Sequence, residues 1–274
     1  MSKIEMNIEL VQKIKVSPTL GIFRFVPIGW EIPDFKAGQY GVLGLPYSAP
    51  RLETADKLDE SDKDPDKLIK RAYSVASSPT VKEYVEYYIA LVESGELTPR
   101  LFAMEPGDKA WMAPKFMGMF TLDEVTDDKN LVFVATGTGL APYMSMIRTH
   151  LECNGKRKFA ILHGARHSWD LAYRSELMGF NSICNNFDYL PIIDNLDGKE
   201  SRWNGKIGFV QDLWNANILE EKWGYKPSPE NTRVFLCGNP RMSEDMIKLL
   251  ESQGFTKHSR KDGTGEIHVE KYWV

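Results

Sequence analysis

Residues 130–142 of the chain read NLVFVATGTGLAP. Residues 130–135 form a continuous apolar run, which is typical of a parallel strand covered on both faces. Gly137 and Gly139 follow, and a helical pattern of apolar residues begins directly after them. Strand, glycine turn and helix form the generic phosphate-binding unit of nucleotide folds, because glycines let the backbone approach the ligand and a helix start favours negative charge. The stretch lacks the full GxGxxG fingerprint, so it predicts a nucleotide-binding sheet without specifying the nucleotide.

The alternation of strands and helices continues after this stretch. Strands separated by helices predict βαβ units and a parallel sheet. The expected strands are 158–163, 187–193, 233–237 and a final one within 266–274, and the expected helices are 171–178, one opening at 209–213, and 242–253. Ligands of such sheets bind at the carboxyl ends of the strands. The tail carries Tyr272 and Trp273, which a free tail does not normally do, so we expect it to dock.

The first part of the chain has a different pattern. Segments 8–16, 21–25, 39–45 and 86–92 are rich in β-branched and aromatic residues and are punctuated by proline and glycine, which predicts an antiparallel sheet or barrel. Residues 47–70 are dominated by charge and predict a solvated insertion loop. We therefore expect two domains, an antiparallel β-barrel at 1–122 and an α/β parallel-sheet domain at 127–274.

Two short stretches of the first domain suit a phosphate-bearing aromatic ligand. Residues 71–74, RAYS, place a guanidinium, a phenol and a hydroxyl on one extended segment. Thr98 followed by Pro99 is a good N-cap and N1 pair, so a short helix is expected there, and its free N–H groups would suit a pyrophosphate. The alternatives are an ordinary half-buried strand and a capped helix without a ligand.

Composition excludes several function classes. A net charge of −4 gives no reason to expect nucleic acid. No run approaches the roughly 20 apolar residues that a membrane span requires, and no secretory signal is visible, so we expect a cytoplasmic protein without a membrane partner. The three cysteines form no CxxC pair, so an iron–sulfur cluster, structural zinc or a disulfide framework is not expected. The histidines show no metal-binding spacing, and no metal is predicted.

The motifs taken together resemble a known family. RAYS at 71–74, GELT at 95–98, GTGLAP at 137–142, CGNP at 237–240 and the terminal EKYW at 270–273 look like the ferredoxin–NADP(H) reductases, closest to the bacterial type. The resemblance covers nearly the whole chain and implies a β-barrel that binds FAD, followed by a parallel-sheet domain that binds NADP(H). It departs in the long 47–70 segment and in Asp194-Asn195, where the family commonly has a serine-arginine pair.

The resemblance also implies roles for individual residues. Arg71 would bind the FAD pyrophosphate, Tyr73 would pack against the isoalloxazine, and Ser74 would lie near flavin N5. The other residues matched to FAD are Ala72, Tyr88, Glu96, Leu97, Thr98, Thr138, Tyr272 and Trp273. The residues matched or offered for NADP(H) are Gly137, Gly139, Arg166, Arg174, Arg202, Lys206, Asn239 and Asp245. Residues expected to act in hydride transfer are Ser74, Cys237, Glu270 and Tyr272.

The predicted activity is hydride exchange between NADP(H) and FAD, followed by single-electron exchange with ferredoxin or flavodoxin, because a flavin converts two-electron steps into one-electron steps. Asp170 and Asp194 leave open an NADH-dependent reductase of free flavin, a cytochrome or an oxygenase component, since carboxylates favour the ribose of NADH. A non-catalytic flavin electron-transfer subunit is the other alternative. A monomer is favoured.

Overall fold

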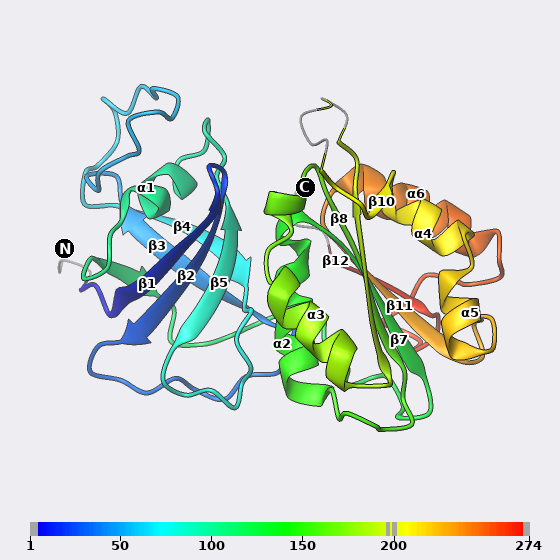
Figure 1. Ribbon diagram of the computed structural model, residues 1–274. Helices are drawn as coiled ribbons and strands as arrows, with labels where there is room; N and C mark the ends of the chain where they lie inside the picture. The colour runs from blue at the N-terminus through cyan, green and yellow to red at the C-terminus, as the bar shows by residue number, and fades with distance from the viewer. Residues whose placement is uncertain (1–4, 196–197, 199–201, 271–274) are drawn as a thin grey trace. The chain divides into compact units, whose positions relative to one another are not determined.

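The computed structural model describes residues 5–195, 198 and 202–270 (Figure 1). The chain divides into two compact units. The first comprises Met1–Thr121 and Met144–Thr149, and the second comprises Leu122–Tyr143 and His150–Val274. Each unit has its own sheet and its own hydrophobic core.

The first unit is built on an antiparallel sheet with the strand order β4-β3-β6-β1-β2-β5. Its strands are β1 (Ile8–Ser17), β2 (Leu20–Pro27), β3 (Tyr40–Pro46), β4 (Leu68–Ser74), β5 (Val85–Ala90) and β6 (Lys109–Met112), and its short helix is α1 (Thr98–Ala103). A bridge between Val75 and Tyr87 brings the end of one edge strand against the other edge strand, so the sheet closes on itself. Closure directs alternate side chains of every strand into one apolar core.

The second unit is a parallel sheet with the strand order β10-β9-β8-β7-β11-β12. Its strands are β7 (Asn130–Thr136), β8 (Phe159–Ala165), β9 (Phe187–Ile193), β10 (Lys206–Ile207), β11 (Thr232–Cys237) and β12 (Ile267–Glu270). Its helical segments are η1 (Gly137–Leu140), the start of α2 (Ala141–His150), η2 (Ser168–Asp170), α3 (Arg174–Ile183), α4 (Val210–Asn215), α5 (Ile218–Trp223) and α6 (Pro240–Glu251). Helices α4, α5 and α6 share one core with the sheet, and α3 lies on the other side of it (Figure 1).

The predicted fold class is confirmed: an antiparallel closed sheet precedes a parallel sheet with intervening helices. The helix expected at 171–178 begins later, at Arg174, because Tyr173 adopts a left-handed conformation with φ of 57° that interrupts it. The final strand covers only Ile267–Glu270 within the described residues. The docking expected of Tyr272 and Trp273 falls outside them.

Residues 47–67 depart from the sequence prediction of a solvated loop. Most of their side chains are exposed, but Tyr47, Ala49 and Leu52 pack against the core of the first unit. The backbone N–H of Leu52 donates to the carbonyl of Pro99 at 3.0 Å. The segment is therefore docked against α1, because these few apolar residues suffice to anchor a chain whose remaining side chains are charged.

The expectation that the cysteines do not pair is wrong for two of them. Cys153 and Cys184 form a disulfide, with their Cα atoms 4.5 Å apart. They lie in the loops that lead into the neighbouring parallel strands β8 and β9, and Asn186 joins the same loops by donating to the carbonyls of Glu152 and Arg157. The spacing of the cysteines along the chain does not predict this disulfide, because the two residues are brought together by the pairing of β8 with β9.

A buried carboxylate on β5 organises one side of the first unit. Glu86 is fully buried and accepts from Arg24 at 2.6 Å and from Arg148 at 2.7 Å. Burial raises the pKa of the Glu86 carboxyl, but Arg148 and Arg24 outweigh it and hold that pKa below its ordinary value. Arg148 also donates to the carbonyl of Ala76, so this cluster fixes the chain directly after β4.

Replacing Glu86 with glutamine should lower the free energy of unfolding by about 3 kcal/mol at pH 7, because two cations lose a buried counter-charge. The control is Glu105→Gln, whose carboxylate is 73% exposed beside Lys13, and that change should cost less than about 1 kcal/mol. Urea unfolding of both variants measures the difference. Equal losses in the two variants would contradict this reading.

The stabilisation by Glu86 depends on pH. Because the folded pKa of Glu86 lies below the unfolded one, its contribution to the free energy of unfolding is present at neutral pH and is lost as the pH falls through the folded pKa.

Candidate functional site

The RAYS stretch forms the end of β4 and presents its side chains in alternation. The Arg71 side chain is 55% exposed and its Nη2 donates to Glu96 Oε2 at 2.8 Å. Tyr73 is half-buried and its ring packs edge-on against Tyr87 at 6.4 Å between centroids. Burial raises the pKa of the Tyr73 hydroxyl, so this phenol stays neutral at physiological pH. The strand thus offers a half-exposed cation held by Glu96 and a neutral aromatic ring, while Ser74 is buried.

The adjacent tyrosines on β5 point in opposite directions. Tyr87 belongs to the inner core and contacts Tyr73, and its hydroxyl approaches Met112 Sδ at 3.0 Å. Tyr88, which the resemblance matches to FAD, is buried on the other face of the strand. The structure therefore does not bring Tyr88 to the side of β5 that packs against Tyr73. Its predicted contact with flavin stays a prediction.

The segment at 96–98 is held by hydrogen bonds that the sequence did not reveal. Glu96 accepts from the Tyr47 hydroxyl at 2.8 Å as well as from Arg71. The prediction that Thr98 caps α1 is wrong, because the helix is capped at Leu97 without a side-chain bond. The Thr98 hydroxyl instead accepts from the backbone N–H of Val92 and donates to the carbonyl of the same residue. These two bonds fix the turn that precedes the helix.

Two glycine turns meet at the carboxyl edge of the parallel sheet. A Cβ at Gly139 would lie 2.1 Å from the carbonyl oxygen of Cys237. A Cβ at Gly238, whose φ is 135°, would lie 2.4 Å from Thr136 Oγ1. The backbone N–H of Asn239 also donates to Thr136 Oγ1 at 2.8 Å. Only glycine permits this approach, and it packs the backbone of the turns after β7 and β11 directly together.

The remaining residues predicted at these turns have different settings. Gly137 has φ of 54°, and an added Cβ would meet no described atom within 4 Å. Thr138 is half-buried in η1. The Asn239 side chain accepts from the N–H of Arg241 and caps α6, so part of its hydrogen-bonding capacity is structural. Asp245 is exposed on α6.

Cys237 and Glu270 are cross-strand neighbours on β11 and β12. The Cys237 Sγ lies 3.9 Å from Glu270 Oε2, within the range of a weak S–H donor bond. Tyr143 of α2 is also buried here. Burial raises the pKa of its hydroxyl, and Cys237 and Glu270 raise it further. Tyr272, expected beside these residues, lies outside the described residues.

The predicted cations of the second unit do not all lie in one place. Arg174 and Lys206 line one cavity of about 340 Å³, where the Arg174 guanidinium stacks over the Trp203 ring at 4.8 Å. Arg166 is exposed just beyond the carboxyl end of β8, and Arg202 is exposed in the chain before β10. The structure therefore brings two of the four cations to one cavity. Trp203 was missed by the sequence reasoning, because only its stacking partner identifies it.

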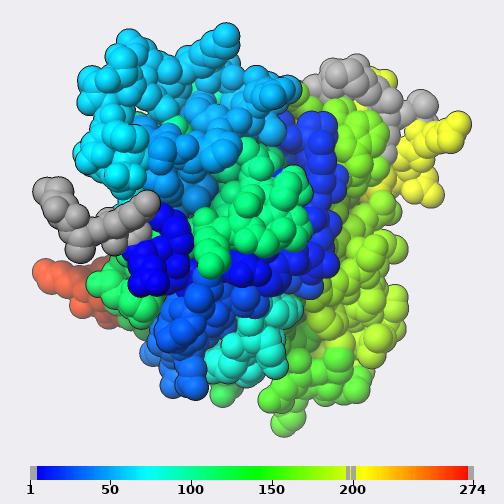
Figure 2. All heavy atoms as spheres, turned by 90° about the vertical axis from the view of Figure 1, so that its left-hand side faces the viewer, coloured from blue at the N-terminus to red at the C-terminus, as the bar shows by residue number. Residues whose placement is uncertain are grey.

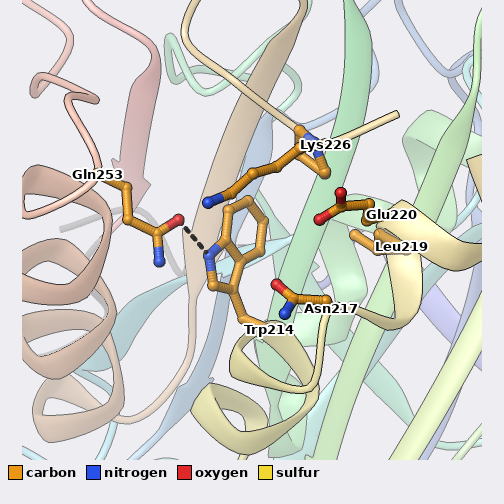
Figure 3. Close-up of a pocket in the computed structure, with 7 residues that line it drawn as sticks. Trp214, Asn217, Leu219, Glu220, Lys226 and Gln253 are labelled. Atoms are coloured by element: carbon orange, nitrogen blue, oxygen red, sulfur yellow. Dashed lines mark hydrogen bonds between the residues drawn. The ribbon is translucent and has the colours of Figure 1, made fainter. Parts of the chain in front are cut away.

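A second pocket of this unit is too small for a nucleotide. It is lined by Trp214, Asn217, Leu219, Glu220, Lys226, Pro227 and Gln253, and its volume is about 10 Å³ (Figure 3). That volume accommodates about one water molecule. Trp214 Nε1 donates to Gln253 Oε1 at 3.0 Å across it (Figure 3), so the pocket is a packing gap between helices.

Two further findings apply to the described ranges, 5–195, 198 and 202–270. Within them, His, Cys, Asp and Glu form no group of three or more that could hold a metal ion. Within the same described ranges, no helix is long and apolar enough to cross a lipid bilayer.

Comparison with known proteins identifies the class. A family model described as the oxidoreductase NAD-binding domain matches residues 133–248, which contain the glycine turns and the cations just described. A solved ferredoxin NADP⁺ reductase from Neisseria gonorrhoeae with bound FAD and NADP has the same fold, with a TM-score of 0.76 and 22% identity over 98% of this chain and 100% of that one. Fold and match together define an oxidoreductase with a dinucleotide-type parallel sheet.

Curated relatives give the family. The flavodoxin/ferredoxin–NADP reductase of Buchnera aphidicola subsp. Schizaphis graminum is 30% identical over 255 residues, which is 93% of this chain and 94% of the relative. The protein of the same name from Escherichia coli strain K12 is 31% identical over 87% of this chain and 88% of its own length. The chain belongs to the flavodoxin/ferredoxin–NADP reductase family. The resemblance read from the motifs is thereby confirmed.

Replacing Gly139 with alanine should lower the free energy of unfolding by about 1–3 kcal/mol, because the new methyl group must displace backbone rather than a flexible side chain. Gly179→Ala on α3 is the matched control. There the added Cβ meets no described atom within 4 Å, and the change should be neutral or stabilise by about 0.5–1 kcal/mol. Denaturant unfolding compares them, and a Gly139 variant as stable as the native protein would refute the close packing of the turns.

Proposed function

We propose that the protein is an FAD-dependent oxidoreductase that exchanges a hydride with NADP(H) and single electrons with ferredoxin or flavodoxin. The observation that carries this is membership of the flavodoxin/ferredoxin–NADP reductase family over nearly the full length of the chain. We assign FAD to the antiparallel domain, predicted at 1–122, and NADP(H) to the parallel-sheet domain, predicted at 127–274.

The residues of the first unit fit a flavin nucleotide. Tyr73 offers a half-exposed, neutral aromatic ring backed by Tyr87, which suits a flat ring system. Arg71 offers a half-exposed guanidinium, and a guanidinium binds phosphate oxygens in a forked geometry. When bound, the flavin supplies the conversion between two-electron and one-electron transfer. In this proposal Arg71 binds phosphate, Tyr73 orients the ring, and Ser74 provides a hydrogen bond.

The residues of the second unit fit a nicotinamide dinucleotide. The glycines of the turns at 137–139 and 238–239 let the backbone come close to a pyrophosphate. Cys237, fully buried at the end of β11, would place the nicotinamide, and the Glu270 carboxyl group beside it would relay a proton. Arg174 and Lys206 supply the positive charge that a 2′-phosphate requires.

The test is spectroscopic and starts from protein purified without added flavin. We expect a yellow protein whose released cofactor is FAD, and whose flavin absorbance is bleached by NADPH in the absence of oxygen. A flavin that is bound but not bleached by either NADPH or NADH would favour an electron-transfer subunit. Faster bleaching by NADH at equal low concentration would favour the NADH-dependent reductases.

The cavity cations generate a prediction about selectivity. Lys206→Gln and Arg174→Gln should each raise the KM for NADPH by about 10- to 100-fold, because each removes a charge-assisted contact worth about 1.5–3 kcal/mol. The KM for NADH should change less than twofold. Lys248→Gln, at an exposed lysine on α6, is the control. Initial rates with both nucleotides decide, and equal effects on NADPH and NADH would remove these two cations from the 2′-phosphate site.

The sequence-based predictions of a monomer and of a cytoplasmic location stay predictions. Light scattering of the purified protein and fractionation of cells test them.

A further inference from the structure

Hydrogen bonds join the segment 47–67 to residues 93–100, and donors on both segments contribute to them. Arg51 Nη1 donates to the carbonyl of Gly95 at 2.9 Å, and the N–H of Asp56 donates to the carbonyl of Glu93 at 3.2 Å. Figure 2 shows the segment gathered on one part of the surface of the first unit, in light blue. Its path is therefore fixed relative to the segment that carries Glu96.

Arg100 is the centre of this attachment. Its side chain is only 1% exposed, although it carries a full charge. Nη1 donates to the carbonyl of Glu96 at 2.7 Å, and Nη2 donates to the carbonyl of Tyr47 at 2.7 Å and to Glu60 Oε2 at 2.6 Å. One buried guanidinium thus joins two points of the 47–67 segment to the backbone of Glu96. The Arg100 guanidinium is held firmly in this position, because losing a partner would leave a buried charged group without compensation.

The Glu96 side chain continues the connection to Arg71. Its Oε1 accepts from the Tyr47 hydroxyl at 2.8 Å, and its Oε2 accepts from Arg71 Nη2 at 2.8 Å. The bond from Tyr47, followed by Arg71, lowers the pKa of the Glu96 carboxyl, and the bond to Glu96 raises the pKa of the Tyr47 hydroxyl. Tyr47 therefore remains a donor and Glu96 remains ionised at neutral pH.

We infer that Tyr47 and Arg100 are positioning residues, which hold Glu96 so that it orients the Arg71 guanidinium toward the phosphates of the flavin nucleotide. The inference rests on the proposed function, because it takes Arg71 to bind those phosphates. Ordering an arginine side chain on binding costs up to about 2 kcal/mol of rotamer entropy. Part of that cost is removed from the binding step when a fixed carboxylate already restrains the side chain before the ligand arrives. The long 47–67 segment thereby has a role in cofactor affinity through Tyr47 and its bonds to Glu96 and Arg100.

The test is a double-mutant cycle on FAD binding by the apoprotein, followed by quenching of flavin fluorescence. Tyr47→Phe keeps the ring and removes the hydroxyl, and it should raise the Kd for FAD about fivefold, the equivalent of one hydrogen bond of about 1 kcal/mol. In the Arg71→Ala background the same substitution should change Kd less than twofold, because the residue through which Tyr47 acts is gone. Tyr84→Phe is the control, since Arg24 stacks on its ring and the ring is retained.

The outcomes separate this inference from the function on which it rests. A Tyr47→Phe variant that binds FAD like the Tyr84→Phe control would overturn the inference. So would a fivefold effect that persists in the Arg71→Ala background, since a purely structural role acts in both backgrounds alike. An apoprotein that does not bind FAD at all, with or without these changes, would instead overturn the proposed function. Urea unfolding of Tyr47→Phe checks that its fold is intact.

Discussion

The contact between two backbone turns at the carboxyl edge of the parallel sheet is the constraint on which the nucleotide unit depends. Strands β7 and β11 are paired from Asn130 opposite Thr232 to Ala135 opposite Cys237. Both strands therefore end at the same level of the sheet. The turns that follow can touch only because Gly139 and Gly238 lack side chains. Thr136 Oγ1 then accepts from the N–H of Asn239 and locks the arrangement. The ends of β7 and β11 are thereby held together by backbone contacts.

In the antiparallel unit the corresponding role belongs to a chain of charged contacts rather than to backbone packing. In the proposed function Arg71 must remain exposed to meet a phosphate, and an exposed arginine is costly to order. The structure restrains it through Glu96, which is itself held by Tyr47 and by the bonds of Arg100. On the other side, buried Glu86 binds Arg148, which holds the carbonyl of Ala76 just beyond β4. The strand that carries Arg71, Tyr73 and Ser74 is thus supported near the guanidinium at one end and beyond its last residue at the other.

Much of this could be read from the sequence, because the signals are local. The apolar run at 130–135 predicts a parallel strand, and the glycines that follow it predict the turn. The parts that could not be read depend on contacts between distant residues. Cys153 and Cys184 meet because β8 and β9 pair, and Tyr47 meets Glu96 because a charged segment docks on α1. Thr98 has the composition of a helix cap, yet its hydroxyl bonds to Val92 instead. The N-cap preference of threonine was outweighed there by a backbone partner six residues earlier in the chain.

The central claim is that the protein couples a two-electron donor to a one-electron carrier, and the most direct test is an electron balance. The purified protein is supplied with a limiting amount of NADPH and an excess of ferredoxin or flavodoxin in the absence of oxygen, and both redox partners are followed by absorbance. The account predicts that two molecules of a one-electron carrier are reduced for each NADPH oxidised. NADPH oxidation that leaves both carriers oxidised, or carrier reduction that requires NADH instead, would contradict it.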